Sequence, residues 1–488
     1  MRDCTPSAPI RLQRGSLTPT GVRIPSTTVA NERSWTIAPT VLWFAGVLVL
    51  VLWWLDGDLD ALADRLTSRR EADGVAVAGP VFVAKPVVVA DVGDDKPPPA
   101  IADHGDRARI GALEDVCLEG TPAACKRWGM DGLYRAIASH KQGKLGRAIR
   151  ASWYGDSVIA TDAIPGRLRA RLQSTFGDGG PGFVYLVAPH RFCAHEAIER
   201  SASGGWTPYA ISTTQIADKL YGVGGSTAET HGGRAIVKLR AGTASVVELY
   251  YLAQPKGGTA ALTTESGPVL TIDSAAATKS ASHASATISG GARRFELTTE
   301  GKVRVFGLAL ENASGAVVDN LGIVSVNVKS FANHDPAVFA AELAHRSADL
   351  TMIMIGANEA AWLGPGDKDT KDYQARFETA IAPLRKARPD GACLVVSPTD
   401  QAEARDGGYP SRAVMPILVA AQRRAAAAQG CAFFSTYDWM GGVGSAAAWF
   451  RKRLVGSDFQ HLTRDGANKL ADAVYDALLT GYSRYAGG

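Results

Sequence analysis

Short apolar runs alternate with helical spacing of apolar residues over the last third of the chain, residues 317–488. The runs "DLTMIMIG", "ACLVVSP" and "CAFFSTY" have the length of buried strands, and segments with apolar residues every three or four positions follow them. This alternation predicts a parallel sheet covered by helices on both faces, the α/β class. The same pattern begins earlier, where "AIRASWYGDS" precedes a helical segment within residues 109–199.

The segment 200–316 has a different pattern. Runs such as "RAIVKLRAG", "SVVELYYLAQ" and "RRFELTTEG" alternate apolar and polar residues, and Gly, Ser and Thr separate them. Alternation without helical spacing predicts antiparallel strands that form a β-sandwich. We therefore expect a three-layer α/β/α domain, made of residues 109–199 and 317–488, that is interrupted by an inserted β-sandwich at 200–316.

One uninterrupted apolar segment, residues 37–55, follows neither pattern. It contains no charged residue and has about the length that a helix needs to cross a bilayer. Arginines precede it and the acidic sequence "DGDLD" follows it, so the positive-inside rule keeps residues 1–36 in the cytoplasm. We predict a single-pass inner-membrane protein in which residues 56–108, rich in Asp, Ala, Val and Pro, form a flexible linker to a periplasmic part.

Composition agrees with a folded protein and narrows the choice of partners. The 488 residues are 46% hydrophobic and 20% charged, as in globular proteins. The formal net charge of +4 is small for this length and no dense basic tract occurs. The sequence therefore predicts no nucleic-acid partner.

The cysteines fit an oxidising compartment. Cys117 and Cys125 are close enough in sequence to close a short loop, and Cys393 and Cys431 each begin a strand-like run. If those two strands are parallel neighbours, the sulfurs of Cys393 and Cys431 can meet, which leaves Cys193 unpaired. No spacing of Cys and His matches a zinc site, so we expect no metal.

Polar residues with catalytic chemistry follow the predicted strands. In doubly wound sheets, functional groups gather at the carboxyl ends of the strands. Four such groups occur in chain order: Gly155-Asp156-Ser157, Asn320 to Ser325, Gly356 to Glu359, and the pair Asp458 and His461 before the last helix. We expect these four segments to meet at one edge of the sheet.

Three of these residues have the chemistry of acyl transfer. Ser157 lies on a strand-to-helix turn, where its hydroxyl is exposed, and His461 is the natural base. Asp458, three residues before His461, can hold one imidazole nitrogen while the other faces Ser157. For Ser157 alone, helix capping is the simpler interpretation, and Asp156 is expected to cap or brace the turn. The joint occurrence with Asp458, His461 and Asn358 favours a nucleophile.

The four segments resemble the blocks of the SGNH hydrolase superfamily, the GDSL-type esterases, over roughly residues 130–190 and 317–485. "WYGDS" followed by "GRLRARLQSTFGDGGPGFV" resembles the opening of the bacterial branch that contains peptidoglycan O-acetylesterases. That branch carries a carbohydrate-binding-module-like β-domain between its first two blocks, where this chain becomes β-rich. The resemblance implies a flavodoxin-like sheet and a catalytic triad that needs no cofactor.

The resemblance also implies an oxyanion hole. Its donors would be the backbone N–H of Ser157, a backbone N–H of the second block and the side-chain amide of Asn358. The family pattern of the second block is close to Asn-x-Gly-x-x-Gly, which places Gly322 in a supporting position and Ser325 where glycine is usual. A backbone N–H survives this change, but a positive φ at Ser325 would be costly.

Other polar and aromatic groups have simpler explanations. Glu342 and His345 have helical spacing and are expected to face solvent or the sheet edge. His190 and His195 flank Cys193 without a trusted ligand spacing, although they could line the substrate cleft. Four aromatic residues of the β-rich segment could stack on sugars, but sandwich core is the more natural role for most of them: Trp206, Tyr209, Tyr250 and Tyr251.

Together these patterns predict a membrane-anchored serine esterase that removes O-acetyl groups from a cell-envelope polysaccharide, such as peptidoglycan, through an acyl-enzyme on Ser157. The inserted β-domain would hold the glycan beside the cleft. Two alternatives remain open. One is an O-acetyltransferase that uses the same triad and passes the acyl group to a sugar hydroxyl. The other is a non-catalytic envelope protein that binds glycan.

Overall fold

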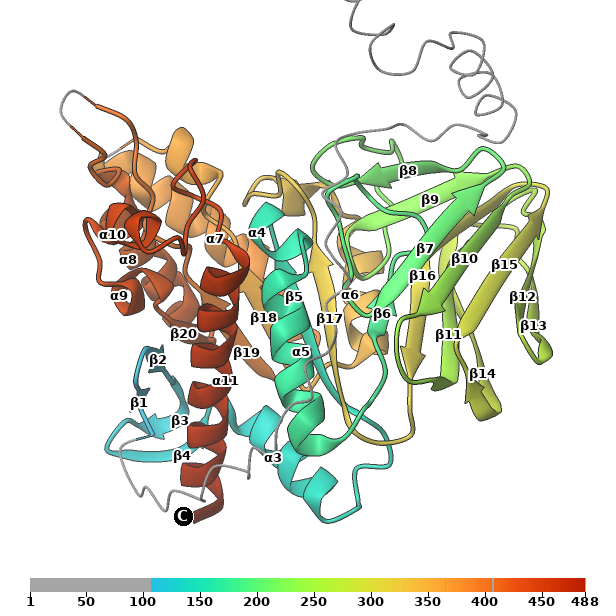
Figure 1. Cartoon of the computed structure of the whole chain (residues 1–488), viewed down its shortest axis with the longest axis horizontal. Helices are drawn as coiled ribbons and strands as arrows, with labels where there is room; N and C mark the ends of the chain where they lie inside the picture. The colour runs from blue at the N-terminus through green and yellow to red at the C-terminus, as the bar shows by residue number, and fades with distance from the viewer. Residues whose placement is uncertain (1–106, 365, 406–407, 488) are drawn as a thin grey trace, which may run out of the picture. The chain divides into compact units, whose positions relative to one another are not determined.

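A seven-stranded sheet forms the centre of the computed structural model, which describes residues 107–364, 366–405 and 408–487. The strand order is β1-β2-β20-β19-β18-β5-β17 (Figure 1). Five neighbouring strands run parallel: β5 (Ile149–Gly155), β17 (Ala316–Gly322), β18 (Leu350–Met354), β19 (Ala392–Val396) and β20 (Ala432–Phe434). When these five strands are numbered by their order in the sequence, they lie across the sheet in the order 2-1-3-4-5, which is the flavodoxin-like arrangement. The predicted α/β class is confirmed.

The expectation of a parallel sheet is wrong at one edge. There β2 (Leu113–Glu114) pairs antiparallel with β20 and forms a hairpin with β1 (Arg109–Ile110). An uncovered β20 would present unpaired backbone groups to solvent, and the short hairpin covers them. Strands of two residues are too short to leave a periodic pattern in the sequence.

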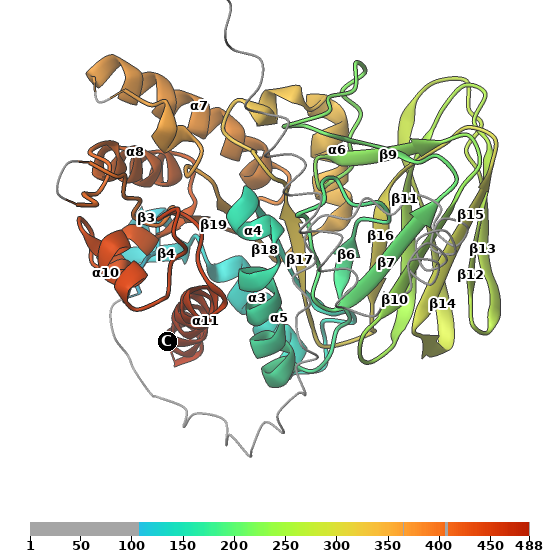
Figure 2. The same ribbon diagram turned by 45° about the horizontal axis from the view of Figure 1, so that its top comes forward.

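Helices cover both faces of this sheet (Figure 2). One face packs against α3 (Asp131–Lys141), α5 (Ala163–Phe176) and α11 (Arg464–Gly487), and the other against α6 (Pro336–Arg346), α7 (Asp367–Lys386) and α8 (Val414–Ala428). Neighbouring residues of a strand point to opposite faces: Met352 joins the first core and Ile353 the second. Because both faces are buried, apolar residues point to both sides of these strands. Two of the few buried polar residues, Ser152 and Asp319, are hydrogen-bonded to each other at 2.7 Å.

Between residues 182 and 311 the chain forms two antiparallel sheets, and the strands of the two sheets are interleaved along the sequence. One has the order β13-β12-β15-β10-β7 and the other β14-β11-β16-β9-β8, with β6 paired to β16. Their strands are β6 (Gly182–Val184), β7 (Ile198–Ser203), β8 (Thr207–Ala210), β9 (Ser226–Thr230), β10 (Arg234–Leu239), β11 (Ala244–Ala253), β12 (Thr259–Thr264), β13 (Gly267–Asp273), β14 (Ser280–Ala292), β15 (Arg294–Glu300) and β16 (Val303–Glu311).

Apolar residues of both antiparallel sheets share one core, to which β10 contributes Val237, β15 contributes Phe295 and β11 contributes Leu249. The antiparallel strands that the sequence predicts are therefore present. The described residues nevertheless belong to one compact unit. Tyr250 and Phe306 of the β-rich segment lie in the same core as Ile353 of the central sheet. The division at 199/200 and 316/317 stays a prediction.

A cluster of two histidines and two glutamates joins the β-rich segment to α6. His283 contacts Glu342 at 2.6 Å and His345 contacts Glu248 at 2.9 Å. The two imidazole rings stack with centroids 3.5 Å apart. Of the two expected surroundings of Glu342, solvent or the sheet edge, solvent is wrong, because Glu342 is fully buried. The helical spacing of Glu342 and His345 could not reveal that β14, which carries His283, packs over Glu342.

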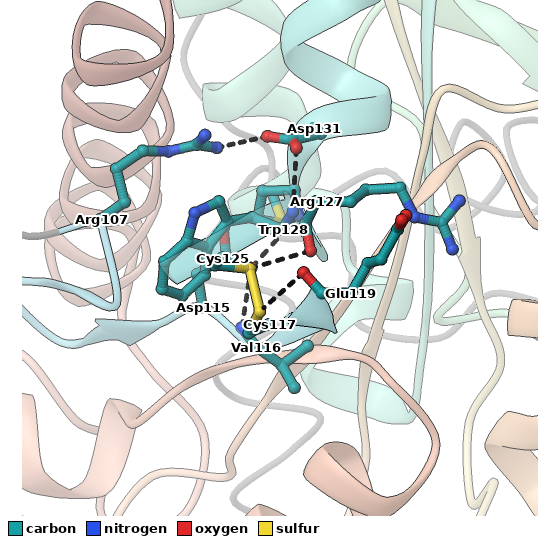
Figure 3. The surroundings of a disulfide bond; sticks show 10 residues. Arg107, Asp115, Val116, Cys117, Glu119, Cys125, Arg127, Trp128 and Asp131 are labelled. Carbon is teal, nitrogen blue, oxygen red and sulfur yellow. Dashed lines mark hydrogen bonds and ion pairs between the residues drawn. A yellow bond between two sulfur atoms is a disulfide. The ribbon is translucent and has the colours of Figure 1, made fainter. Parts of the chain in front are cut away.

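Both expected cysteine pairs form disulfides. Cys117–Cys125 joins β3 (Cys117–Thr121) to β4 (Ala124–Trp128), as Figure 3 shows. Cys393–Cys431 joins the beginnings of β19 and β20, which are parallel neighbours as the prediction required. Cys193 is free and buried.

The predicted cytoplasmic segment (1–36), the transmembrane helix (37–55) and nearly all of the linker (56–108) lie outside the described residues. Within the described ranges, no helix is both long enough and apolar enough to cross a membrane. These predictions therefore stay predictions.

Candidate active site

The turn after β5 presents Ser157 at the carboxyl edge of the central sheet. β5 ends at Gly155 and the short helix α4 (Ser157–Ala160) begins two residues later. Asp156 caps this helix, because its carboxylate accepts a hydrogen bond from the backbone N–H of Val158 at 3.0 Å. A side chain at Gly155 would come within 2.8 Å of the carbonyl oxygen of Met354, so the tight turn requires glycine. The predicted bracing by Asp156 is present.

The structure brings Ser157, His461 and Asp458 together. The hydroxyl of Ser157 lies 2.7 Å from Nε2 of His461, and Nδ1 of His461 lies 2.6 Å from Oδ2 of Asp458. When Nδ1–H donates to the carboxylate, Nε2 is free to accept the hydroxyl proton. The side chain of His461 is 40% exposed, so the three groups open to solvent. This is the geometry in which a serine can act as a nucleophile.

The carboxylates around the triad have shifted pKa values. Partial burial raises the pKa of Asp458, but hydrogen bonds from the side chain and backbone of His461 outweigh burial and hold it below its usual range. Asp458 is therefore ionised at neutral pH and can stabilise a protonated His461. Burial raises the pKa of Asp156 to about 6, against the opposing effects of the Val158 N–H and the nearby charge of His461.

An aromatic socket holds the loop that carries Asp458 and His461. Phe459 is buried against Ala402 and Ala446. Its φ of 54° is in the left-handed region, which is a strained conformation for a bulky residue. The ring of Tyr409 stacks on Phe459 with centroids 4.5 Å apart. The socket thus fixes the residue between the acid and the base of the triad.

Two of the predicted oxyanion residues, Ser325 and Asn358, lie at the loop after β17. The side-chain amide of Asn358 donates one hydrogen bond to the carbonyl of Val326 at 2.8 Å, which leaves its second N–H for another acceptor. Ser325 is exposed and has a φ of 66°, the left-handed conformation for which glycine would be favoured. Gly322 packs so closely on α4 that an added Cβ would lie 2.4 Å from the backbone nitrogen of Ala160. Gly322 therefore supports the loop by close packing.

Glu359 is a further residue of this site for which the sequence suggested no role. Its side chain is fully buried, and Oε1 accepts a hydrogen bond from the backbone N–H of Val328 at 2.9 Å. Asn358 and Glu359 thus hold the loop of Ser325 at two points, Val326 and Val328. Burial raises the pKa of Glu359 to about 7. The charge of Asp156 also raises this pKa, whereas the hydrogen bond from Val328 lowers it. Its only signal in the sequence is its place directly after Asn358.

Replacement of Glu359 tests how its burial depends on pH. Between pH 4.5 and about 7 the unfolded chain releases this proton while the folded protein keeps it, so the contribution of Glu359 to stability falls as pH rises. Glu359→Gln keeps an oxygen acceptor for Val328 and cannot ionise. We expect the variant to gain up to about 3 kcal/mol in free energy of unfolding relative to wild type as pH rises through this window. Urea unfolding at several pH values measures the difference; a difference independent of pH contradicts the assignment.

The cysteine–histidine segment does not form a ligand set. His195 and Cys193 are both buried, and burial lowers the pKa of His195 to about 3. No group of three or more potential ligands is placed to hold a metal among the described residues. His190 binds the backbone N–H of Phe192 at 3.3 Å. The idea that His195 lines a cleft is wrong, since its ring is in the protein interior.

The aromatic residues of the β-rich segment divide between core and partly exposed positions. Tyr250 is fully buried and packs edge-to-face on Phe183. Trp206, Tyr209 and Tyr251 are partly buried and pack against apolar cores. Core packing thus accounts for Tyr250 as expected, and for much of the surface of the other three.

Comparisons with known proteins agree with this geometry. Residues 286–468 match the model of the GDSL-like lipase/acylhydrolase family, a match that includes Asn358, Asp458 and His461 but begins after Ser157. No curated protein sequence matches the chain.

Among solved structures, a peptidoglycan O-acetylesterase is similar with a TM-score of 0.64 and 23% identity, over 76% of this chain and 99% of that chain. An acetyl xylan esterase has a TM-score of 0.26 and 14% identity, over 33% of this chain and 80% of that one. An acetylxylan esterase from Geobacillus stearothermophilus has a TM-score of 0.25 and 18% identity, over 33% and 73%. Residues 286–468 are therefore similar to the GDSL-like lipase/acylhydrolase family, and the chain has a fold that it shares with a solved peptidoglycan O-acetylesterase.

Proposed function

We propose that the chain is a serine esterase that removes O-acetyl groups from a cell-envelope polysaccharide, with peptidoglycan as the substrate. The observation that carries this proposal is the continuous hydrogen-bonded series from Asp458 through His461 to Ser157. The shared fold with a peptidoglycan O-acetylesterase supports the choice of substrate. No cofactor is required by this chemistry.

In the first half of the reaction, Oγ of Ser157 attacks the carbonyl carbon of the acetyl ester and its proton moves to Nε2 of His461. The negative charge that develops on the carbonyl oxygen is stabilised by the backbone N–H groups of Ser157 and Ser325 and by the free amide N–H of Asn358. The bond to the sugar oxygen then breaks. His461 returns the proton to that oxygen, so the sugar leaves as an alcohol and the acetyl group stays on Ser157.

In the second half, water attacks the acetyl carbon while His461 takes its proton. The collapse of this second tetrahedral intermediate releases acetate and restores the Ser157 hydroxyl. The side chains of His461 and Asp458 are 40% and 52% exposed. Water can therefore reach the imidazole, which favours hydrolysis over transfer of the acetyl group to a second sugar.

The location of the protein is part of the proposal. The predicted helix at 37–55 would anchor the chain in the inner membrane with its N-terminus in the cytoplasm. Disulfides persist in oxidising compartments, and both cysteine pairs of the α/β part are oxidised. A catalytic part in the periplasm accounts for both the predicted anchor helix and the two disulfides. The β-rich segment would then act as an inserted domain that holds the glycan.

Active-site labelling tests the proposed nucleophile. We expect a fluorophosphonate to label Ser157 of the full chain, as located by mass spectrometry, and His461→Ala to abolish the labelling because the hydroxyl loses its base. Ser266→Ala, at an exposed turn of the β-rich segment, serves as the matched control and should label like wild type. Absence of label on Ser157 would favour the glycan-binding alternative. Incubation of wild type with an aryl acetate and a sugar acceptor separates esterase, which yields free acetate, from transferase, which yields acetylated sugar.

A further inference from the structure

The large hydrophobic side chains that are exposed in the described residues share one side of the central sheet. Like Ser157, each of them belongs to a segment that follows a strand, and these segments lie on the same side as Ser157. The five residues are Phe192, Trp362, Tyr409, Val443 and Phe450. In Figure 1, α4 and α10 mark this upper side. Among exposed apolar groups, aromatic rings that a neighbouring side chain supports are candidates for binding a ligand.

Four of these five side chains are aromatic, and two of the four, Trp362 and Tyr409, belong to segments next to the residues proposed for catalysis. Trp362 is 45% exposed and ends the short helix η2 (Glu359–Ala361), which Asn358 precedes. The ammonium group of Lys329 lies 4.3 Å from the centroid of the Trp362 ring. Lys329 belongs to the loop of Ser325, so this pair lies beside the oxyanion residues.

Tyr409 occupies the corresponding place beside the triad. It is 51% exposed and stacks on Phe459 with the ring planes 27° apart. Phe459 is two residues from His461, and two residues of extended chain span at most about 7 Å. Phe450 also contacts Phe459, at a centroid distance of 4.7 Å, and is itself partly exposed.

We propose that Trp362 and Tyr409 are two sugar-binding positions that hold pyranose units of the glycan on either side of the acetylated residue. This inference rests on the proposed function, since it assigns the binding of that substrate. The C–H face of a pyranose ring is apolar, whereas its rim carries hydroxyl groups. An aromatic ring that is supported from behind and open in front is complementary to that face, and nearby polar groups such as Lys329 suit the rim.

The support of each ring distinguishes this arrangement from scattered surface residues. Phe459 holds one face of Tyr409 and Lys329 holds one face of Trp362, so each ring needs little reorganisation when a ligand stacks on it. Val443 has the highest exposure of the five, 74%, and has no ring. It therefore provides a matched control on the same side of the molecule.

The test compares a polymeric substrate with a small one in the full chain. We expect Trp362→Ala and Tyr409→Ala each to lower kcat/KM for soluble O-acetylated peptidoglycan fragments, relative to kcat/KM for 4-nitrophenyl acetate, by about tenfold. The loss should appear in KM for the fragments. Trp362→Phe and Tyr409→Phe keep a ring and should restore most of the ratio, and Val443→Ala should leave the ratio unchanged.

Two failures can be told apart. If the wild type hydrolyses the fragments and the ratio is the same in both alanine variants, the aromatic rings only brace the active-site loops and the sugar-binding positions are wrong. If the wild type hydrolyses 4-nitrophenyl acetate but releases no acetate from the fragments, the proposed function is wrong. Binding of the fragments to Ser157→Ala, measured by calorimetry, adds a readout without turnover. Trp362→Ala in that background should weaken binding by about tenfold, and unchanged affinity would overturn the inference.

Discussion

Ser157→Ala is expected to lower kcat for 4-nitrophenyl acetate by about 10⁴-fold or more, because no other group can form the acyl-enzyme. The hydroxyl lies 2.7 Å from Nε2 of His461, and its loss leaves the imidazole without a nucleophile to activate. The activity that remains would come from the oxyanion donors and from substrate binding. Release of 4-nitrophenol, followed by absorbance, measures the effect.

Two controls accompany this variant. Ser266→Ala should keep kcat within about twofold of wild type, since the residue is at an exposed turn remote in sequence from the four polar segments. Thermal unfolding should give a Tm for Ser157→Ala close to that of wild type, because the side chain is only partly buried and its partner His461 remains solvated. A Ser157→Ala protein that retains more than a tenth of wild-type kcat would exclude the proposed mechanism.

Asn358→Ala is expected to lower kcat by about 100- to 1,000-fold with a much smaller change in KM. One N–H of the Asn358 amide holds the carbonyl of Val326, and the other is free to bind the oxygen on which charge develops. An interaction that strengthens only as this charge forms acts on kcat. The loss should therefore be similar for 4-nitrophenyl acetate and for acetylated glycan, unlike the loss expected for Trp362→Ala.

A second replacement separates this role from simple bracing of the loop. Asn358→Asp keeps the size of the side chain, but a carboxylate cannot donate to either acceptor and adds a negative charge beside the oxyanion. We expect it to be at least as inactive as Asn358→Ala. If Asn358→Asp were as active as wild type while Asn358→Ala were not, the residue would act by packing alone.

Much of the α/β part is readable from local pattern. The strand β19 is buried on both faces and leaves a continuous apolar run in the sequence, whereas the runs of β5 and β18 are interrupted by Arg150, Ser152 and Thr351. Helices such as α6 and α11 carry apolar residues on one side, which is visible as a period of three to four. The antiparallel strands β10 and β15 alternate buried and less buried residues, which is visible as a period of two.

Features that depend on long-range contacts left no local signal. The hairpin of β1 and β2 is too short for periodicity and exists because β20 needs a partner at the edge. Glu342 is polar and lies in a regular helix, yet His283 from a distant strand buries it. Glu359 follows Asn358 in sequence, but only the folded loop places Val328 against its carboxylate.

By itself, the sequence determined the class of fold and the identity of the polar groups at the strand ends, because burial dictates the period of the apolar residues and polar residues directly follow the apolar strands. It also pointed to both cysteine pairs: Cys117 and Cys125 through their closeness in sequence, and Cys393 and Cys431 through the expected neighbourhood of their strands. Only the tertiary structure decided that Ser157 and His461, 304 positions apart, lie in hydrogen-bond contact. It also decided that buried Glu359 holds the loop of Ser325, that Tyr409 stacks on Phe459, and that Lys329 lies over the ring of Trp362. Distances between remote segments follow from how the layers pack, and no local pattern encodes them.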